Sequence, residues 1–136
     1  QVERARREGA SDVVGRLVEN AATVDSARVI AESVEVADQD ELRTLGDQLR
    51  DRLGTGVVVL SAQMGERTSL FAVVTDDLIG QGVRADVVVR RLAQLTGGSG
   101  GGRPHMAQGG VGDAAKVPEA LDQAPAVVRE LMGKDG

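Results

Sequence analysis

The sequence predicts an α/β fold in which helices pack on a small mixed β-sheet, preceded by an N-terminal helix. Helical spacing of apolar residues alternates along the chain with runs of β-branched residues. Val57 to Leu60 has no polar interruption, which is typical of a strand covered on both faces. A length of 136 residues fits one compact domain. Together these observations indicate helices layered on a sheet.

The N-terminal segment, residues 1–22, is expected to be an amphipathic helix. Its apolar residues recur at near-helical spacing among Arg and Glu, although Gly9 and Gly15 weaken the pattern. Two interpretations stay open. The helix either lies on the domain's own core or forms the end of a connecting or dimerisation arm. We therefore divide the chain into this helix and a globular domain over residues 23–136.

The next segment predicts β-structure followed by a helix. Val24 to Val36 is rich in β-branched residues and indicates one strand or two short ones. Asp38 and Glu41 match a capping box at a helix start, and Gly54 is a typical helix stop. The apolar stripe of this helix consists of Leu42, Leu45, Leu49 and Leu53.

A hairpin and a second helix follow. Met64 to Thr68 indicates a turn between the buried strand and a second strand at residues 70–75. The adjacent Asp76 and Asp77 are interpreted as a solvated strand end or helix cap. A loop then leads to helical spacing from Val83 to Leu95.

The C-terminal part combines a glycine run with a last helix. Residues 97–102 contain five glycines and are expected to form a loop that exposes its backbone. A helix is predicted from about Val117, with Pro118 in its first turn. Pro125 lies inside this helix and should kink or split it.

Composition excludes several function classes. The chain has no cysteine and a single histidine, so it cannot build a disulfide framework or a structural zinc site by itself. A net charge of −5 argues against indiscriminate coating of nucleic acid. Phe71 is the only aromatic residue, which excludes an aromatic stacking platform for single-stranded RNA. The sequence contains no apolar run of about 18 residues, the length that predicts a membrane span. We expect a cytoplasmic protein.

The sequence shows no catalytic constellation either. Its carboxylates fall mostly on polar helix faces, and no pair stands out for acid–base work. The glycine run matches neither a Walker loop, because no Gly-Lys-Ser/Thr ends it, nor a dinucleotide fingerprint, because it follows a helix.

The glycine run and its continuation are the candidate binding motif, residues 97–110. A flexible linker would explain the glycines alone, but the continuation Arg-Pro-His-Met-Ala-Gln-Gly-Gly is more specific than a spacer needs. Gly100, Gly101 and Gly102 would let a ligand backbone come close, and Arg103 offers a planar fork for phosphate. His105 and Gln108 are candidate RNA contacts, with an ordinary surface histidine as the alternative for His105.

A local excess of positive charge adjoins this motif. Its basic side chains are those of Arg84, Arg90, Arg91 and Arg103, opposed by Asp86 alone between residues 84 and 103, with Lys116 following. They represent either an ordinary solvated helix face or a surface that steers phosphates. Their position beside the glycine run favours phosphate steering.

The string Gly97-Gly98-Ser99-Gly100-Gly101-Gly102-Arg103-Pro104-His105-Met106-Ala107-Gln108-Gly109-Gly110 resembles the signature of the DHH-associated domain at the C-terminus of alanyl-tRNA synthetases. The segments over residues 47–60 and 85–93 resemble the same family, so that the likeness spans the whole chain. The family commonly has an acidic residue where His105 stands.

This resemblance implies a non-catalytic, tRNA-binding domain. Such a domain grips the outer corner of tRNA-Ala and helps couple aminoacylation with editing, while ATP and zinc belong to preceding domains of the parent ATP-dependent ligase. The implied partners are tRNA-Ala, the other synthetase domains and a second subunit joined through the N-terminal helix. Two alternatives remain: a dimerisation module of the same enzyme, or the substrate-binding domain of a DHH-type nucleic-acid phosphodiesterase.

Overall fold

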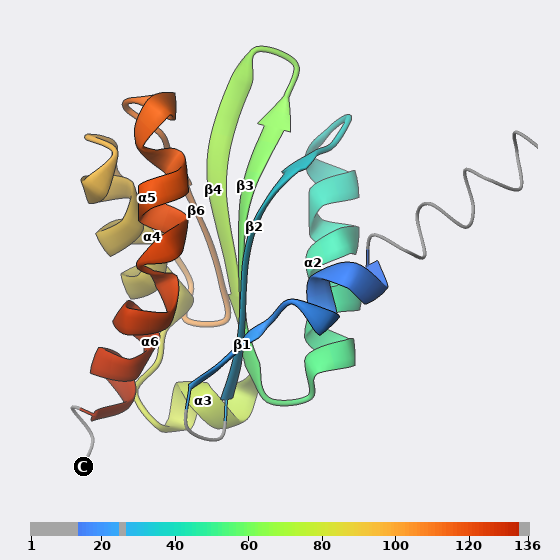
Figure 1. Ribbon diagram of the computed structural model, residues 1–136, viewed down its shortest axis with the longest axis vertical. Coiled ribbons are helices and arrows are strands. Elements are labelled where there is room, and N and C mark those ends of the chain that lie inside the picture. Colours follow the sequence, from blue (N-terminus) through green and yellow to red (C-terminus); the bar gives the residue numbers. More distant parts are fainter. Residues whose placement is uncertain (1–13, 25–26, 134–136) are drawn as a thin grey trace, which may run out of the picture.

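A computed structural model describes residues 14–24 and 27–133 and contains a six-stranded mixed sheet in the order β1-β2-β3-β4-β6-β5 (Figure 1). Strands β2 and β3 are parallel, and the other neighbouring pairs are antiparallel. The strands are β1 (Ala22–Val24), β2 (Ala27–Glu35), β3 (Gly56–Met64), β4 (Arg67–Val74), β5 (Gly100–Gly102) and β6 (Met106–Gly110). The predicted α/β class is therefore confirmed.

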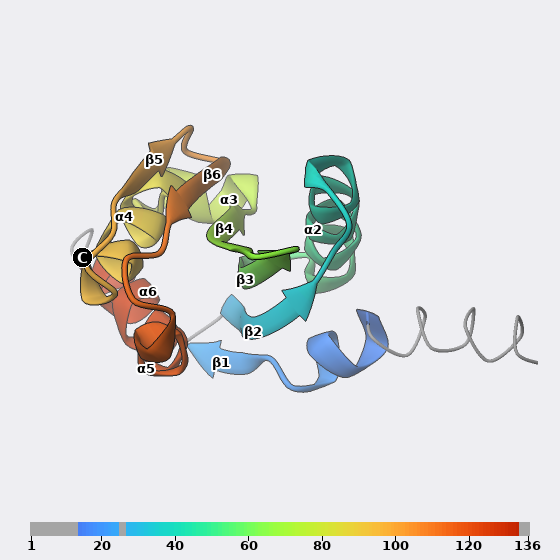
Figure 2. The same cartoon turned by 90° about the horizontal axis from the view of Figure 1, so that it is seen from above.

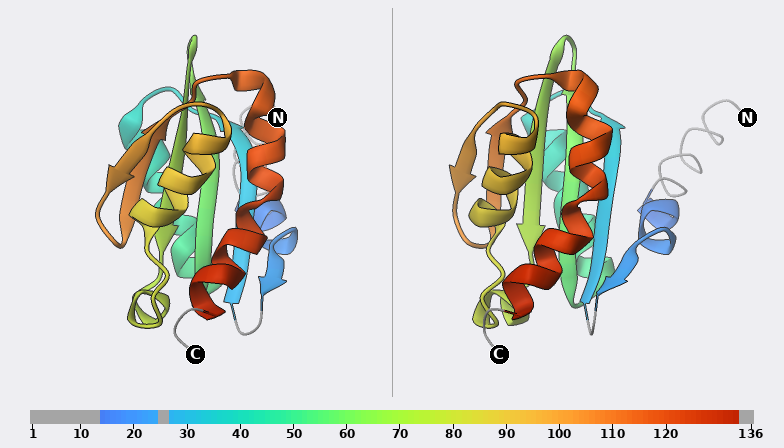
Figure 3. Two further views of the ribbon diagram at one scale, coloured as in Figure 1. Left: turned by 90° about the vertical axis from the view of Figure 1, so that its left-hand side faces the viewer. Right: turned by 60° about the vertical axis from the view of Figure 1, so that its left-hand side comes forward.

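Helices cover both faces of the sheet. The helical elements are α2 (Gln39–Leu53), α3 (Asp76–Gly80), α4 (Ala85–Leu95), the 3-10 turn η1 (Ala114–Lys116), α5 (Val117–Asp122) and α6 (Ala124–Gly133). Figure 2 shows α2 on one side of the curved sheet and α4, α5 and α6 on the other. The three C-terminal helices also stay together in the views of Figure 3. We call the two sides the α2 face and the α4 face.

The alternation of side chains along the central strands builds one core on each face. On β3, Val57 and Val59 join the core beneath α4, whereas Val58 and Leu60 join the core beneath α2. This is the period of two expected of a strand. It explains why the run carries no polar residue, since both of its faces are buried.

The predicted start and stop signals are confirmed. The Asp38 carboxylate accepts the backbone N–H of Glu41 at 2.9 Å at the start of α2. Gly54 ends the helix with φ 74°, and its N–H donates to the Arg50 carbonyl. The C-terminal helix is split into α5 and α6 just before Pro125, as a proline within a helical pattern predicts.

Only part of the predicted N-terminal helix is described. Residues 14–19 are helical, whereas residues 1–13, which would carry most of an arm, lie outside the described residues. Leu17 is buried in the α2-face core, and the Arg28 guanidinium donates to the Val18 carbonyl. This short piece therefore lies on the domain's own core. Across residues 14–24 and 27–133, no helix has the length and apolar character to cross a membrane.

Two local predictions need correction. The glycine run is not simply a loop, because Gly100 to Gly102 form β5 and pair with β6. Of the two interpretations of Asp76 and Asp77, the strand end is wrong, because both residues lie in the first turn of the short helix α3 that follows β4.

Candidate nucleic-acid interface

The turn between β5 and β6 is tied to its neighbours by backbone hydrogen bonds. The Arg103 N–H donates to the Met106 carbonyl at 2.9 Å, closing the turn. The Pro104 carbonyl accepts the N–H of Ala85 at the start of α4, at 2.7 Å. The His105 carbonyl accepts the N–H of Val74 at the end of β4, at 3.0 Å. The exposed side chains of Arg103 and His105 thus project from a fixed backbone.

Most glycines of the motif have an internal packing role. A Cβ at Gly100 would lie 2.6 Å from Val89 Cγ1 of α4, and one at Gly109 would lie 2.8 Å from the same atom. At Gly98 an added Cβ would meet the Gly110 carbonyl oxygen at 2.1 Å. These contacts are closer than non-bonded atoms tolerate. Gly100 thus turns its Cα toward α4, so that an RNA backbone could not approach it from that side.

Gly101 differs from its neighbours because nothing lies within 4 Å of the Cβ that it could carry. It is paired with Gln108 across the hairpin. Strand alternation turns it away from α4, whereas Gly100 and Gly109 face α4. The half-buried Gly101 thus turns a backbone without a side chain toward open space on the α2 face of the hairpin.

A polar hollow of about 520 Å³ lies between this face and α2. We call it the first hollow. Five of the predicted site residues line it: Gly101, Gly102, Arg103, His105 and Gln108. Gln39 and Arg43 of α2 line the opposite side, and sequence reasoning missed both of them. Phe71 also contributes, although its ring is almost completely buried.

A second hollow of about 580 Å³ adjoins the first. Gln39 and Gln108 line both hollows, and they are joined by two hydrogen bonds. Gln39 Nε2 donates to Gln108 Oε1 at 2.5 Å, and Gln108 Nε2 donates to Gln39 Oε1 at 3.1 Å. The second hollow continues past this pair along Glu66, Arg67, Thr68, Ser69 and Gly110, so that one acidic and one basic side chain line it.

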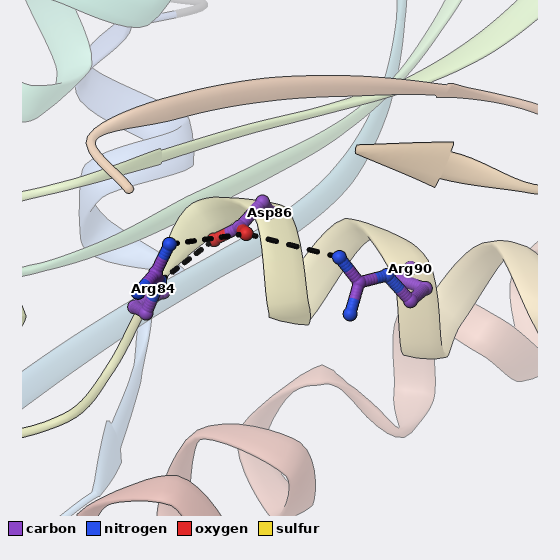
Figure 4. A network of polar contacts seen from close by, with 3 residues as sticks. All are labelled: Arg84, Asp86 and Arg90. Atoms are coloured by element: carbon purple, nitrogen blue, oxygen red, sulfur yellow. Dashed lines mark hydrogen bonds and ion pairs between the residues drawn. The ribbon is translucent and has the colours of Figure 1, made fainter. Parts of the chain in front are cut away.

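Arg84, just before α4, and Arg90 within it line neither hollow. Figure 4 shows Asp86 between Arg84 and Arg90, with Nε of Arg84 3.1 Å and Nη2 of Arg90 3.8 Å from its carboxylate oxygens. Arg84 nevertheless lies beside the hairpin turn, since the next residue, Ala85, bonds to Pro104. The predicted basic patch is therefore partly neutralised by Asp86, whose side chain is only 11% exposed.

Arg91 and Lys116 lie elsewhere. Arg91 Nη2 is 3.2 Å from a carboxylate oxygen of Glu130 on α6, which places the pair on the α4 face. Lys116 is exposed at the end of η1, where the Asp113 carboxylate accepts the backbone N–H of Ala115 at 3.0 Å. The structure thus separates these two cations from the first hollow.

The carboxylate of Asp77 is held by two threonine hydroxyl groups. It accepts hydrogen bonds from the Thr55 hydroxyl at 2.5 Å and from the Thr75 hydroxyl at 2.6 Å. These bonds hold the pKa of Asp77 below its ordinary value, because they favour the charged form. The cluster joins the turn before β3 to the start of α3. Within the described part of the chain, no three His, Cys, Asp or Glu residues gather as a metal site.

Residues 26–130 match the family model described as the DHHA1 domain. The chain belongs to this family. It is 43% identical over 117 residues to "Alanine--tRNA ligase" from Roseiflexus sp. (strain RS-1), a match that covers 86% of this chain and 13% of that protein. The chain therefore spans about 13–15% of the length of such relatives.

Solved structures give the same placement. The crystal structure of the C-Ala domain from Aquifex aeolicus alanyl-tRNA synthetase superposes with a TM-score of 0.70 at 28% identity, covering 81% of this chain and 98% of that domain. The resemblance to alanyl-tRNA synthetase C-terminal domains is therefore confirmed. RecJ from Thermus thermophilus shares the fold, with a TM-score of 0.63 at 17% identity over 93% of this chain and 18% of RecJ.

Proposed function

We propose that the chain is the tRNA-binding, non-catalytic C-terminal domain of an alanine–tRNA ligase. In this role it holds the outer corner of tRNA-Ala and helps couple aminoacylation with editing. The names of the relatives support the parent enzyme, and the similarity to an isolated C-Ala domain supports the position in it. ATP, zinc and the reaction itself are assigned to the rest of the ligase, in the cytoplasm.

The first hollow is the observation that carries this proposal. Arg103 and His105 project from a backbone that three hydrogen bonds fix, and Arg43 lines the hollow from α2. Gly101 leaves bare backbone on the floor between them. Positively charged side chains around a patch of bare backbone suit RNA, because phosphates bind positive charge and flat bases can lie closely on a surface without side chains.

Each residue then has a defined task. Arg103 contacts phosphate through its planar guanidinium, and Arg43 supplies a second positive charge from the opposite side. His105 and Gln108 donate hydrogen bonds to the RNA. Arg84, beside the turn, attracts phosphates over a longer range, as does Arg90, while their shared partner Asp86 reduces that attraction.

Salt dependence of binding tests this proposal. The dissociation constant of the 136-residue chain for a tRNA-Ala transcript is measured by fluorescence anisotropy at several salt concentrations. Binding should weaken as salt rises, because RNA phosphates release counterions when cations neutralise them. Arg103→Ala should weaken binding and lower the slope of log Kd against log salt by about one, the value of one phosphate contact.

Arg91→Ala is the matched control, because it removes the same charge from the α4 face, where Glu130 already pairs with it. It should bind within about twofold of wild type, as expected of an exposed ion pair. Absence of salt-dependent binding, or equal effects of the two substitutions, would contradict the proposal.

A further inference from the structure

The pair of carboxamides formed by Gln39 and Gln108 divides one groove into two hollows of similar size. Both residues line the hollow of about 520 Å³ and the hollow of about 580 Å³. The two residues are 69 positions apart in the sequence, one on α2 and one on β6. Their two hydrogen bonds therefore form a bar across the groove, which is open on either side of it.

Each side of the bar has a floor of bare backbone. Gly101 lies opposite Gln108 on the neighbouring strand, and nothing is within 4 Å of its added Cβ. Gly110 is two residues beyond Gln108 on β6, about 7 Å along the strand, and its nearest contact is the Ser99 carbonyl oxygen at 4.0 Å. Neither glycine is required by the protein's own packing, in contrast to Gly100 and Gly109.

The bar keeps hydrogen-bonding capacity after its two internal bonds. A carboxamide has two N–H donors and a carbonyl oxygen with two lone pairs, so each amide retains one N–H and one lone pair. Such groups suit the edge of a base, which offers donors and acceptors in one plane. Arg43 and Arg103 supply positive charge for a flanking phosphate on one side. On the other side Arg67 does so beside the acidic Glu66, which lines the same hollow and offsets its charge.

We propose that Gln39 is an RNA-binding residue, and that with Gln108 it separates two subsites that each receive one unpaired base. One base lies over Gly101 in the first hollow, and the other lies over Gly110 in the second. The bases must be unpaired, because in a duplex their Watson–Crick edges pair with one another and their faces stack on neighbouring bases, so that neither is free for the amides and the glycines. The bare glycine backbone replaces the aromatic platform that the chain lacks. This inference rests on the proposed function.

The pair also explains how Gln108 is positioned. A free glutamine side chain has several rotatable bonds, and fixing it on binding costs conformational entropy. Part of this entropy is already lost in the free protein, because Gln39 holds the Gln108 carboxamide in place before RNA binds. Gln39 thus acts both through its own amide and through Gln108.

Substitution of Gln39 tests the inference. Gln39→Ala should raise the Kd for a tRNA-Ala transcript about three- to tenfold, the effect of losing one to two hydrogen bonds. The slope of log Kd against log salt should not change, because no charge is removed. In a double-mutant cycle, Gln39→Ala should add less than about twofold to the loss caused by Gln108→Ala, since both remove the same bar.

Gln48→Ala is the matched control on the same helix. Gln48 is exposed and lines a different pocket, next to residues 14–20, so its removal should leave the Kd unchanged within about twofold. An independent measurement follows the side-chain NH₂ resonances by NMR. Those of Gln39 and Gln108 should shift when tRNA-Ala is added, whereas that of Gln48 should stay in place.

The outcomes separate this inference from the proposed function. If Arg103→Ala weakens binding while Gln39→Ala binds like wild type, the inference is overturned and the proposed function stands. If Gln48→Ala weakens binding as much as Gln39→Ala, the effect belongs to α2 in general and the inference also fails. If the wild-type chain shows no salt-dependent binding of tRNA-Ala, both fail. Equal competition by a blunt RNA duplex would overturn the assignment to unpaired bases.

Discussion

Alanine substitution at Gly100 and at Gly101 should give opposite results although the residues are neighbours. At Gly100 the new Cβ would lie 2.6 Å from Val89 Cγ1 and 2.6 Å from Gly109 Cα. Ordinary contact begins near 3.4 Å, so that atoms must move apart by about 0.8 Å. One of the two is a backbone atom within the hairpin, which cannot relax by changing rotamer.

The cost follows from this overlap. Overpacking of a well-packed region reduces the free energy of unfolding by about 1–3 kcal/mol, and the backbone contact places Gly100→Ala in the upper half of that range. At about 4 °C for each kcal/mol in a domain of this size, the melting midpoint should fall by about 8–12 °C. Gly101→Ala meets nothing within 4 Å, and its free energy of unfolding should stay within about 1 kcal/mol of wild type.

Thermal and urea unfolding followed by circular dichroism measure both values. Wild type and the two variants are compared at one protein concentration, and the urea series shows whether the m-value is unchanged. Equal loss of stability in the two variants would refute the distinction between a packed and an exposed glycine. So would a Gly100→Ala chain that melts at the wild-type temperature.

Three further changes test other parts of the structure. Leu92→Ala should cost about 3 kcal/mol in urea unfolding, because the Leu92 side chain of α4 is fully buried and its loss leaves a cavity. Asp38→Ala should cost about 1 kcal/mol in the same assay, through loss of the α2 cap. Thr55→Val should raise the pKa of Asp77 in an NMR titration, since the Thr55 hydroxyl is its main stabilising partner. The folded pKa of Asp77 lies below the unfolded one, so its contribution to stability is present above about pH 4 and is lost as pH falls through the folded pKa. The stability difference between wild type and Thr55→Val should therefore shrink at low pH. A difference that grows below about pH 4 would contradict the role of the Thr55 hydroxyl.

Elements with local signals could be predicted from the sequence. Asp38 caps its helix through a contact three residues away, and Pro125 breaks a helix by its own ring. The buried strand β3 could also be predicted without knowing its neighbouring strands, because its composition alone indicates burial on both faces. Such signals depend on the chain within a few residues.

The glycine run shows where local reasoning ends. Glycine has low β propensity, so that three successive glycines gave no strand signal. Gly100 to Gly102 form β5 because β6 pairs with them and α4 packs closely over them. The same pattern therefore contains glycines of two kinds, and only the contacts with Val89 separate Gly100 from Gly101.

Parts of the candidate site were likewise beyond local reasoning. Gln39 and Arg43 belong to α2, more than 50 residues before the hairpin in the sequence, and reach the first hollow only because α2 packs on the same sheet. Arg91 finds its acidic partner Glu130 on another helix, 39 residues later. Charge counts along the chain therefore overestimated the basic patch near the motif.

The central claim is that the α2 face of the β5–β6 hairpin receives the RNA on bare backbone at Gly101. The most direct test is the Kd of the Gly101→Ala chain for a tRNA-Ala transcript, measured beside wild type at one salt concentration. The structure predicts about tenfold weaker binding, with a melting midpoint within about 4 °C of wild type, because the added methyl group occupies the space that the RNA requires. Wild-type affinity in a normally folded Gly101→Ala chain would contradict the claim.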